Sequence, residues 1–188
     1  MKFLEKYNNK KNIRFLSFKE TFKICQNRNF KNIVETGTSR GKIKLFFFRK
    51  YNWKDGMSTI MFAEYAKFIN GKLHTCDISK ENIKNAKKFT SNFKNFVNYY
   101  TDDSVNFLNN FNETIDLLYL DSFDGHDKDK ASEHQLKEAK ASINKLCSNA
   151  LILLDDKGAK TNLSIDFYKN NGFKTIFETE NQILFSKI

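Results

Sequence analysis

The stretch VETGTSRG spans residues 34–41, and a second glycine turn, DGMST, follows at residues 55–59. A short apolar run at 32–34 precedes the first turn, and the helical pattern IMFAEYAKFIN follows the second turn at 60–70. A strand that leads through a glycine turn into a helix N-terminus forms a nucleotide-binding corner. The segment therefore predicts a Rossmann-like α/β fold.

An acidic residue, Glu35, ends the first predicted strand. A carboxylate at this position would repel a pyrophosphate, so the corner does not suit a dinucleotide. It suits a cationic ligand without phosphate, such as S-adenosyl-L-methionine (SAM). We expect the residues of the two turns to contact this cofactor: Glu35, Gly37, Thr38, Gly56, Ser58 and Thr59.

Strand and helix patterns alternate along the rest of the chain. Four more strands are predicted, at 72–78, 96–101, 114–121 and 150–155. Helices are predicted at 17–28, 58–70, 79–89, 104–111, 131–147 and 161–171. Two final apolar runs flank Thr179–Asn181 and predict an antiparallel hairpin. This order predicts one domain over residues 1–188, built as a doubly wound, mostly parallel sheet with an antiparallel C-terminal hairpin strand.

Two segments lie outside this alternation. Residues 1–30 form a predicted helical extension, in which Ser17 and Glu20 are spaced as a capping box. Residues 41–55 interrupt the cofactor turn with an aromatic-rich insert, GKIKLFFFRKYNWKD. The insert could be a lid over the ligand, an oligomer contact that would make a homodimer, or an extra strand packed on the core.

The composition excludes some functions. The chain has no proline, which excludes the Asn/Asp-Pro-Pro-aromatic loop of amino-methyltransferases and the Pro-Cys nucleophile of cytosine-C5 enzymes. The net charge of +10 invites a nucleic-acid partner. Because the positive residues are mostly lysines scattered through nearly every segment, the charge favours a solvated surface, and nucleic acid is disfavoured as a partner.

Three isolated cysteines, Cys25, Cys76 and Cys147, lack the spacing of a metal or redox motif. We expect reduced thiols and a cytoplasmic protein. The first residues contain no apolar segment typical of a signal peptide. No apolar run approaches the roughly 20 residues that a membrane span needs, so no membrane partner is expected.

Each parallel strand ends in a carboxylate or directly before one, and these ends meet at the ligand-binding edge of such sheets. Asp77 suits hydrogen bonds to ribose hydroxyls, and Asp103 with Ser104 suits an adenine ring. Helix N-capping explains any one of these residues, but it does not explain the ordered set. The remaining strand-end acids are Asp121, Asp155 and Asp156.

The motifs VETG, DGMST, LHTCDIS, TDDSVNFL, IDLLYLDS and LILLDDKG together resemble a class I SAM-dependent methyltransferase over residues 30–188. Within that class the chain is similar to the metal-dependent small-molecule O-methyltransferases of the catechol, macrocin and novobiocin sugar type. The resemblance implies methyl transfer to a hydroxyl of a sugar or secondary metabolite. It also implies that Asp121, Asp155 and Asp156 hold a divalent cation. Oxygen ligands favour Mg²⁺, Mn²⁺ or Ca²⁺. The alternative is that Asp121 contacts the methionine part of SAM or the acceptor, while Asp155 and Asp156 cap the following loop.

The catalytic base is expected near Asp121, where the family often places a lysine or an aspartate two or three residues further on. Here Asp124 is the first candidate for the base and His126 the second, and Asp121 itself is the third expected catalytic residue. His134 and Glu138 lie one helical turn apart, so they share a face that either reaches the site or faces solvent.

Three other functions remain alternatives. An RNA methyltransferase would use the lysine excess for phosphate contacts. A short-chain dehydrogenase is suggested by TGTSRG, but Ile43 stands in place of the last glycine and no Tyr-x-x-x-Lys follows residues 114–121. A non-catalytic methyltransferase-like subunit is the third, and the retained carboxylates speak against it.

Overall fold

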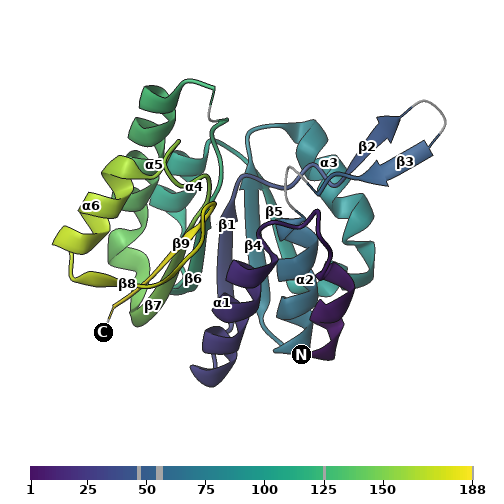
Figure 1. The fold of residues 1–188 in the computed structure, drawn as a ribbon, viewed down its shortest axis with the longest axis horizontal. Helices are drawn as coiled ribbons and strands as arrows, with labels where there is room; N and C mark the ends of the chain where they lie inside the picture. Colours follow the sequence, from purple (N-terminus) through teal and green to yellow (C-terminus); the bar gives the residue numbers. More distant parts are fainter. Residues whose placement is uncertain (46–47, 54–56, 125, 188) are drawn as a thin grey trace.

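The computed structural model describes residues 1–45, 48–53, 57–124 and 126–187. Its main sheet has seven strands in the order β5-β4-β1-β6-β7-β9-β8 (Figure 1). The strands are β1 Asn32–Thr36, β4 Lys72–Asp77, β5 Val97–Thr101, β6 Ile115–Leu120, β7 Leu146–Leu154, β8 Phe173–Glu178 and β9 Ile183–Lys187. Five strands that are adjacent in the sheet, β5, β4, β1, β6 and β7, pair parallel with their neighbours. β9 pairs antiparallel with β7 and β8, which confirms the predicted doubly wound sheet with its C-terminal hairpin.

Helices cover both faces of the sheet (Figure 1). One face carries α1 Phe15–Asn27, α2 Ser58–Phe68 and α3 Lys80–Phe89, together with the 3₁₀ helices η1 Lys2–Tyr7 and η2 Ser91–Phe96. The other face carries α4 Ser104–Asn110, α5 Lys128–Ser142 and α6 Asn162–Asn170. None of the helices in the described part of the chain has the length and apolar character to cross a membrane.

Alternate residues of the central strands enter different cores. Ile33 and Tyr119 belong to the core beneath α1 and α2, whereas Val34 and Leu120 belong to the core beneath α4, α5 and α6. This period of two, with both faces apolar, is expected for parallel strands buried on both sides. Packing on both faces therefore holds the sheet in position. The polar residues just beyond its strand ends are attached to this rigid support.

Two predicted helix boundaries are wrong. α1 begins at Phe15, and the Oγ atom of buried Ser17 lies 3.2 Å from Thr179 Oγ1 instead of capping the helix. α5 ends at Ser142 and passes through the 3₁₀ turn η3 Ile143–Lys145, so Leu146 begins β7. In both cases a contact with a distant part of the fold outweighs a local signal.

The insert forms a two-stranded antiparallel hairpin, β2 Lys42–Leu45 with β3 Phe48–Tyr51. In the described chain these strands pair only with each other, and the hairpin projects from the body beside α3 (Figure 1). The hairpin therefore does not extend the main sheet. The lid and the oligomer contact stay predictions, and Phe46 and Phe47 lie outside the described residues.

Candidate functional site

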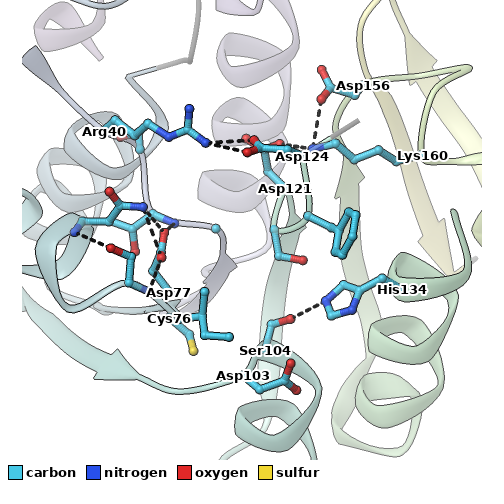
Figure 2. A pocket seen from close by; sticks show the side chains of 18 of the residues that line it. Arg40, Cys76, Asp77, Asp103, Ser104, Asp121, Asp124, His134, Asp156 and Lys160 are labelled. Atoms are coloured by element: carbon cyan, nitrogen blue, oxygen red, sulfur yellow. Dashed lines mark hydrogen bonds and ion pairs between the residues drawn. The ribbon is translucent and has the colours of Figure 1, made fainter. Parts of the chain in front are cut away.

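A cavity of about 660 Å³ lies beyond the C-terminal ends of the parallel strands. Loops after β1, β4, β5, β6 and β7 form its wall (Figure 2). Among the described residues, the charged side chains on the wall are five aspartates, Asp77, Asp103, Asp121, Asp124 and Asp156, and three cations, Arg14, Arg40 and Lys160. Because acidic side chains outnumber basic ones on this wall, the cavity differs from a phosphate-binding site.

Gly37 makes the turn at the end of β1. Its φ angle is +82°, and its backbone N–H donates to the Cys76 carbonyl at 2.9 Å. A Cβ atom at this position would lie 2.2 Å from the backbone oxygen of Asp121. The loops after β1 and β6 thus approach so closely that a glycine is required here.

Glu35 lies behind the cavity wall instead of on it. Its Oε2 atom accepts hydrogen bonds from Thr59 Oγ1 at 2.8 Å and Thr75 Oγ1 at 2.7 Å. Ser39 exchanges hydrogen bonds with Thr59 through backbone and side chain. These contacts fasten the cofactor turn to the start of α2.

Ser58 and Thr59 are likewise buried and do not line the cavity. We expected Glu35, Ser58 and Thr59 to contact the ligand. In the structure they lie behind the cavity wall and support it. Gly56 lies outside the described residues. Thr38 is on the wall as expected, with its N–H 3.1 Å from Asp77 Oδ2.

Burial raises the pKa of Glu35 to about 7, while the hydrogen bonds from Thr75 and Thr59 oppose that shift. Between about pH 4.5 and pH 7 the folded state therefore binds a proton that the unfolded state has released. The free energy of unfolding should fall by on the order of 3 kcal/mol as the pH rises through this window.

Glu35→Gln should remove this pH dependence. Urea denaturation at about pH 5 and about pH 8 measures the free energy of unfolding of both proteins. As the pH rises, the variant should become more stable relative to the wild type. Glu178→Gln, at a glutamate with a half-exposed side chain, is the control. An identical pH dependence for wild type and Glu35→Gln would contradict the expectation.

Asp77 ends β4 and faces the cavity (Figure 2). Ser79 N–H donates to its Oδ1 atom at 2.7 Å, and the Asn82 amide donates to both carboxylate oxygens at 3.2 and 3.1 Å. Two backbone donors thus orient the carboxylate, while a side-chain amide occupies its open side. A diol could replace that amide contact.

Asp103 caps α4 by accepting hydrogen bonds from the backbone N–H groups of Val105 and Asn106. Its neighbour Ser104 has its Oγ atom 2.9 Å from His134 Nε2. Both Asp103 and Ser104 line the cavity, as does His134. The face that carries His134 and Glu138 therefore points toward the site.

Glu138 lies deeper on α5 and is 1% exposed. Its Oε1 atom is 3.9 Å from His134 Nε2. Burial raises the pKa of Glu138, although His134 opposes the shift. Since Glu138 does not line the cavity, it supports His134 from behind.

Asp121, Asp155 and Asp156 converge at the end of the cavity away from Asp77, with one oxygen from each within 4.8 Å of the others. Arg14 Nε lies 2.7 and 2.8 Å from the two oxygens of Asp155, and its Nη2 lies 2.8 Å from Asp156 Oδ1. Lys160 Nζ lies 2.9 Å from both Asp121 Oδ1 and Asp156 Oδ2. The acids therefore come together as the resemblance implied, but two cationic side chains already bind them.

The chain around the triad holds these cations in place. Arg14 precedes α1, and its side chain is 9% exposed. The turn after β7 folds back, with Asp156 at a φ angle of +53°, so that the Lys160 N–H donates to the Asp156 carbonyl. Sequence reasoning missed both residues. The i,i+4 spacing from Asp156 to Lys160 was a usable signal, whereas nothing local marks Arg14.

The charged groups of this cluster shift one another's pKa values. Burial alone would lower the pKa of Lys160, but Asp121 and Asp156 raise it above its ordinary value, so the ammonium stays protonated. Burial and the nearby Asp155 raise the pKa of Asp121, while Lys160 opposes the shift. Asp121 thus combines a raised pKa with a place on the cavity wall.

The two base candidates lie elsewhere. Asp124 lines the cavity, but its carboxylate pairs with Arg40 Nη2 at 2.8 and 3.0 Å, and its side chain is 65% exposed (Figure 2). Both carboxylate oxygens of Asp124 are thus already taken up by a guanidinium. His126 is exposed and does not line the cavity. The structure therefore leaves Asp121 as the best-placed acid of the three expected catalytic residues.

The sequence of residues 53–157 matches the family model described as a methyltransferase domain. The chain belongs to this methyltransferase family. No curated protein matches the methyltransferase at a significant level.

Solved structures show the same fold. The methyltransferase PaMTH1 of Podospora anserina, bound to S-adenosylhomocysteine (SAH), is 12% identical with a TM-score of 0.66, over 93% of this methyltransferase and 79% of that chain. An O-methyltransferase of Bacillus cereus in complex with SAH is 15% identical with a TM-score of 0.62, over 100% and 88%. A putative rRNA methylase of Clostridium thermocellum is 15% identical with a TM-score of 0.60, over 92% and 97%. At these identities the likeness concerns the fold.

Proposed function

We propose that this methyltransferase transfers the methyl group of SAM to a hydroxyl oxygen of a small molecule. The observation that carries the proposal is the acid-rich cavity at the strand ends, with Asp77 at one end and the Asp121 cluster at the other (Figure 2). Its volume of about 660 Å³ falls within the roughly 300–1,000 Å³ typical of small-molecule sites. SAM is a sulfonium cation with a ribose diol and no phosphate, which matches acids on the wall.

SAM would lie with its ribose on Asp77, displacing the Asn82 amide from the carboxylate. Ile78 and Phe123 line the cavity and are 75% and 40% exposed, so two apolar side chains are available to an adenine ring. Ser104 and Asp103 would meet the polar edge of that ring. The two SAH-bound structures with this fold support SAM as the cofactor.

The methyl acceptor would lie toward the Asp121 end. Hydrogen-bonding groups gather there, namely Asp121, Asp156 and Lys160. Asp121 would accept the hydroxyl proton as the oxygen attacks the methyl group, and the fixed strand ends would hold the two reactants in line. The O-methyltransferase with this fold supports an oxygen acceptor.

The test is SAM binding by Asp77 variants. Asp77→Ala should weaken SAM binding by about 1.5–3 kcal/mol, roughly 10- to 150-fold, because hydrogen bonds to a charged acceptor are lost. Isothermal titration calorimetry with SAM and SAH measures the loss. Asn82→Ala is the matched control, since it removes the amide that SAM would displace and should change affinity only a few-fold. Equal affinity of Asp77→Ala and wild type would contradict the ribose assignment.

An RNA acceptor is the second candidate, and one observation favours it. Lys80, Lys84, Lys87 and Lys88 of α3 line a shallow hollow next to Thr101. These lysines could follow a phosphate backbone, and such binding weakens steeply with salt. Retention of RNA on a filter at low salt, lost at moderate salt and in Lys84→Glu, would favour RNA; absence of retention at low salt would leave the small-molecule proposal.

A further inference from the structure

The acidic triad has the shape of a divalent-cation site but holds an ammonium. Lys160 Nζ lies between two of the three acids, 2.9 Å from Asp121 Oδ1 and 2.9 Å from Asp156 Oδ2. A Mg²⁺, Mn²⁺ or Ca²⁺ ion shared by these carboxylates would need the same oxygens at roughly 2.0–2.6 Å. The two occupants therefore exclude each other.

The third acid is also satisfied. Both oxygens of Asp155 accept hydrogen bonds from Arg14 Nε, and Arg14 Nη2 reaches Asp156 Oδ1. Three carboxylates and two cations leave a formal charge of one negative on the cluster, in place of the three that would attract a divalent ion. The residues present thus do not fit a resident metal.

Lys160 cannot leave this position cheaply. The residue is 3% exposed, and its backbone is held by the turn in which both Ala159 and Lys160 donate N–H groups to the Asp156 carbonyl. A buried ammonium that loses its carboxylate partners has a large desolvation cost. A metal ion would therefore have to displace a fixed, paired cation.

We propose that the Lys160 ammonium is the built-in cation of this site, so that the protein binds no divalent metal there and meets the acceptor oxygen with Lys160 instead. Two of the three ammonium N–H groups are used by the two aspartates, and Lys160 lines the cavity. The acceptor contact rests on the proposed methyl transfer. The exclusion of metal does not.

Mn²⁺ titration followed by electron paramagnetic resonance tests the exclusion directly. Metal-stripped wild-type protein should leave the Mn²⁺ signal free, whereas Lys160→Met, which keeps the volume of the side chain but not its charge, should bind about one equivalent. Lys157→Met is the matched control. It removes the same charge from the same turn, but Lys157 Nζ pairs with Glu178 instead of the triad, so this variant should behave as wild type.

The outcomes separate cleanly. Tight stoichiometric Mn²⁺ binding by wild type that is lost in Asp121→Asn would overturn the proposal, and so would a folded Lys160→Met variant without bound Mn²⁺. If circular dichroism shows that Lys160→Met does not fold, the wild-type titration decides alone.

The acceptor contact has its own readout. Lys160→Met should retain SAM affinity within about threefold by calorimetry, because Asp77 and Asp103 are unchanged, but should lose at least roughly tenfold in kcat/KM. Added Mg²⁺ should restore part of the lost kcat/KM of Lys160→Met and should leave the kcat/KM of the wild type unchanged. Loss of wild-type turnover in EDTA would overturn this proposal, whereas absence of SAM binding to wild type would overturn the proposed function and leave the Mn²⁺ result standing.

Discussion

Gly37→Ala should lower the free energy of unfolding by about 3–5 kcal/mol and abolish measurable SAM binding. The new Cβ would lie 2.2 Å from the Asp121 carbonyl oxygen and 2.8 Å from the Ser122 Cα atom. Both are backbone atoms of the loop after β6, so no side chain can rotate away to make room. The φ angle of +82° adds the strain of a left-handed alanine. Urea denaturation and calorimetry with SAM measure the two effects.

Gly172→Ala is the matched control. Gly172 has nearly the same φ angle, +84°, but no described atom lies within 4 Å of its added Cβ. This variant should pay only the backbone strain, about 1–2 kcal/mol, and should bind SAM as wild type does. Equal losses of stability for the two variants would show that the contact between the β1 and β6 loops is not as close as the structure has it.

Arg14→Met should destabilise the protein by about 3–5 kcal/mol, because it leaves Asp155 buried without its cationic partner. The Asp155 side chain is 1% exposed, and both of its oxygens accept hydrogen bonds from Arg14 Nε. For a chain of this size the melting temperature should fall by roughly 10 °C. Differential scanning calorimetry measures the shift.

Arg40→Met is the control for the loss of an arginine–aspartate pair. Arg40 also binds an aspartate, Asp124, but the two side chains are 50% and 65% exposed, so the loss should stay below about 1 kcal/mol. The double variant Arg14→Met/Asp155→Asn should recover part of the stability lost in Arg14→Met, since no buried charge is left unpaired. A double variant as unstable as the single one would contradict the argument.

Most of the fold could be predicted from local pattern. The strands at 32–36 and 72–77 are where their apolar runs indicated, and Ser79 caps α3 through the Asn82 N–H. The misplaced boundaries share one cause. Ser17 is drawn into a contact with Thr179, and the chain after Ser142 turns early to start β7, so tertiary packing overrides the local preference.

The candidate site could be predicted in part. Parallel strands place their C-terminal ends at one edge, and for that reason Asp77, Asp103, Ser104 and Asp121 all line one cavity. The same reasoning could not separate a residue on the wall from one behind it. Glu35 sits one residue before the end of β1 and is buried, with its carboxylate turned to two threonines.

The succession of strands along the chain and the row of acids at their ends were determined by the sequence alone, because both depend on residue patterns within a few positions of one another. The tertiary structure decided what those acids do. Arg14 and Asp155 are 141 positions apart, and no periodicity or spacing relates them. Only the docking of α1 against the sheet brings a guanidinium onto Asp155, and only the left-handed turn at Asp156 brings Lys160 back over the triad. In the sequence the three aspartates resemble a metal site, but in the structure Arg14 and Lys160 pair with them.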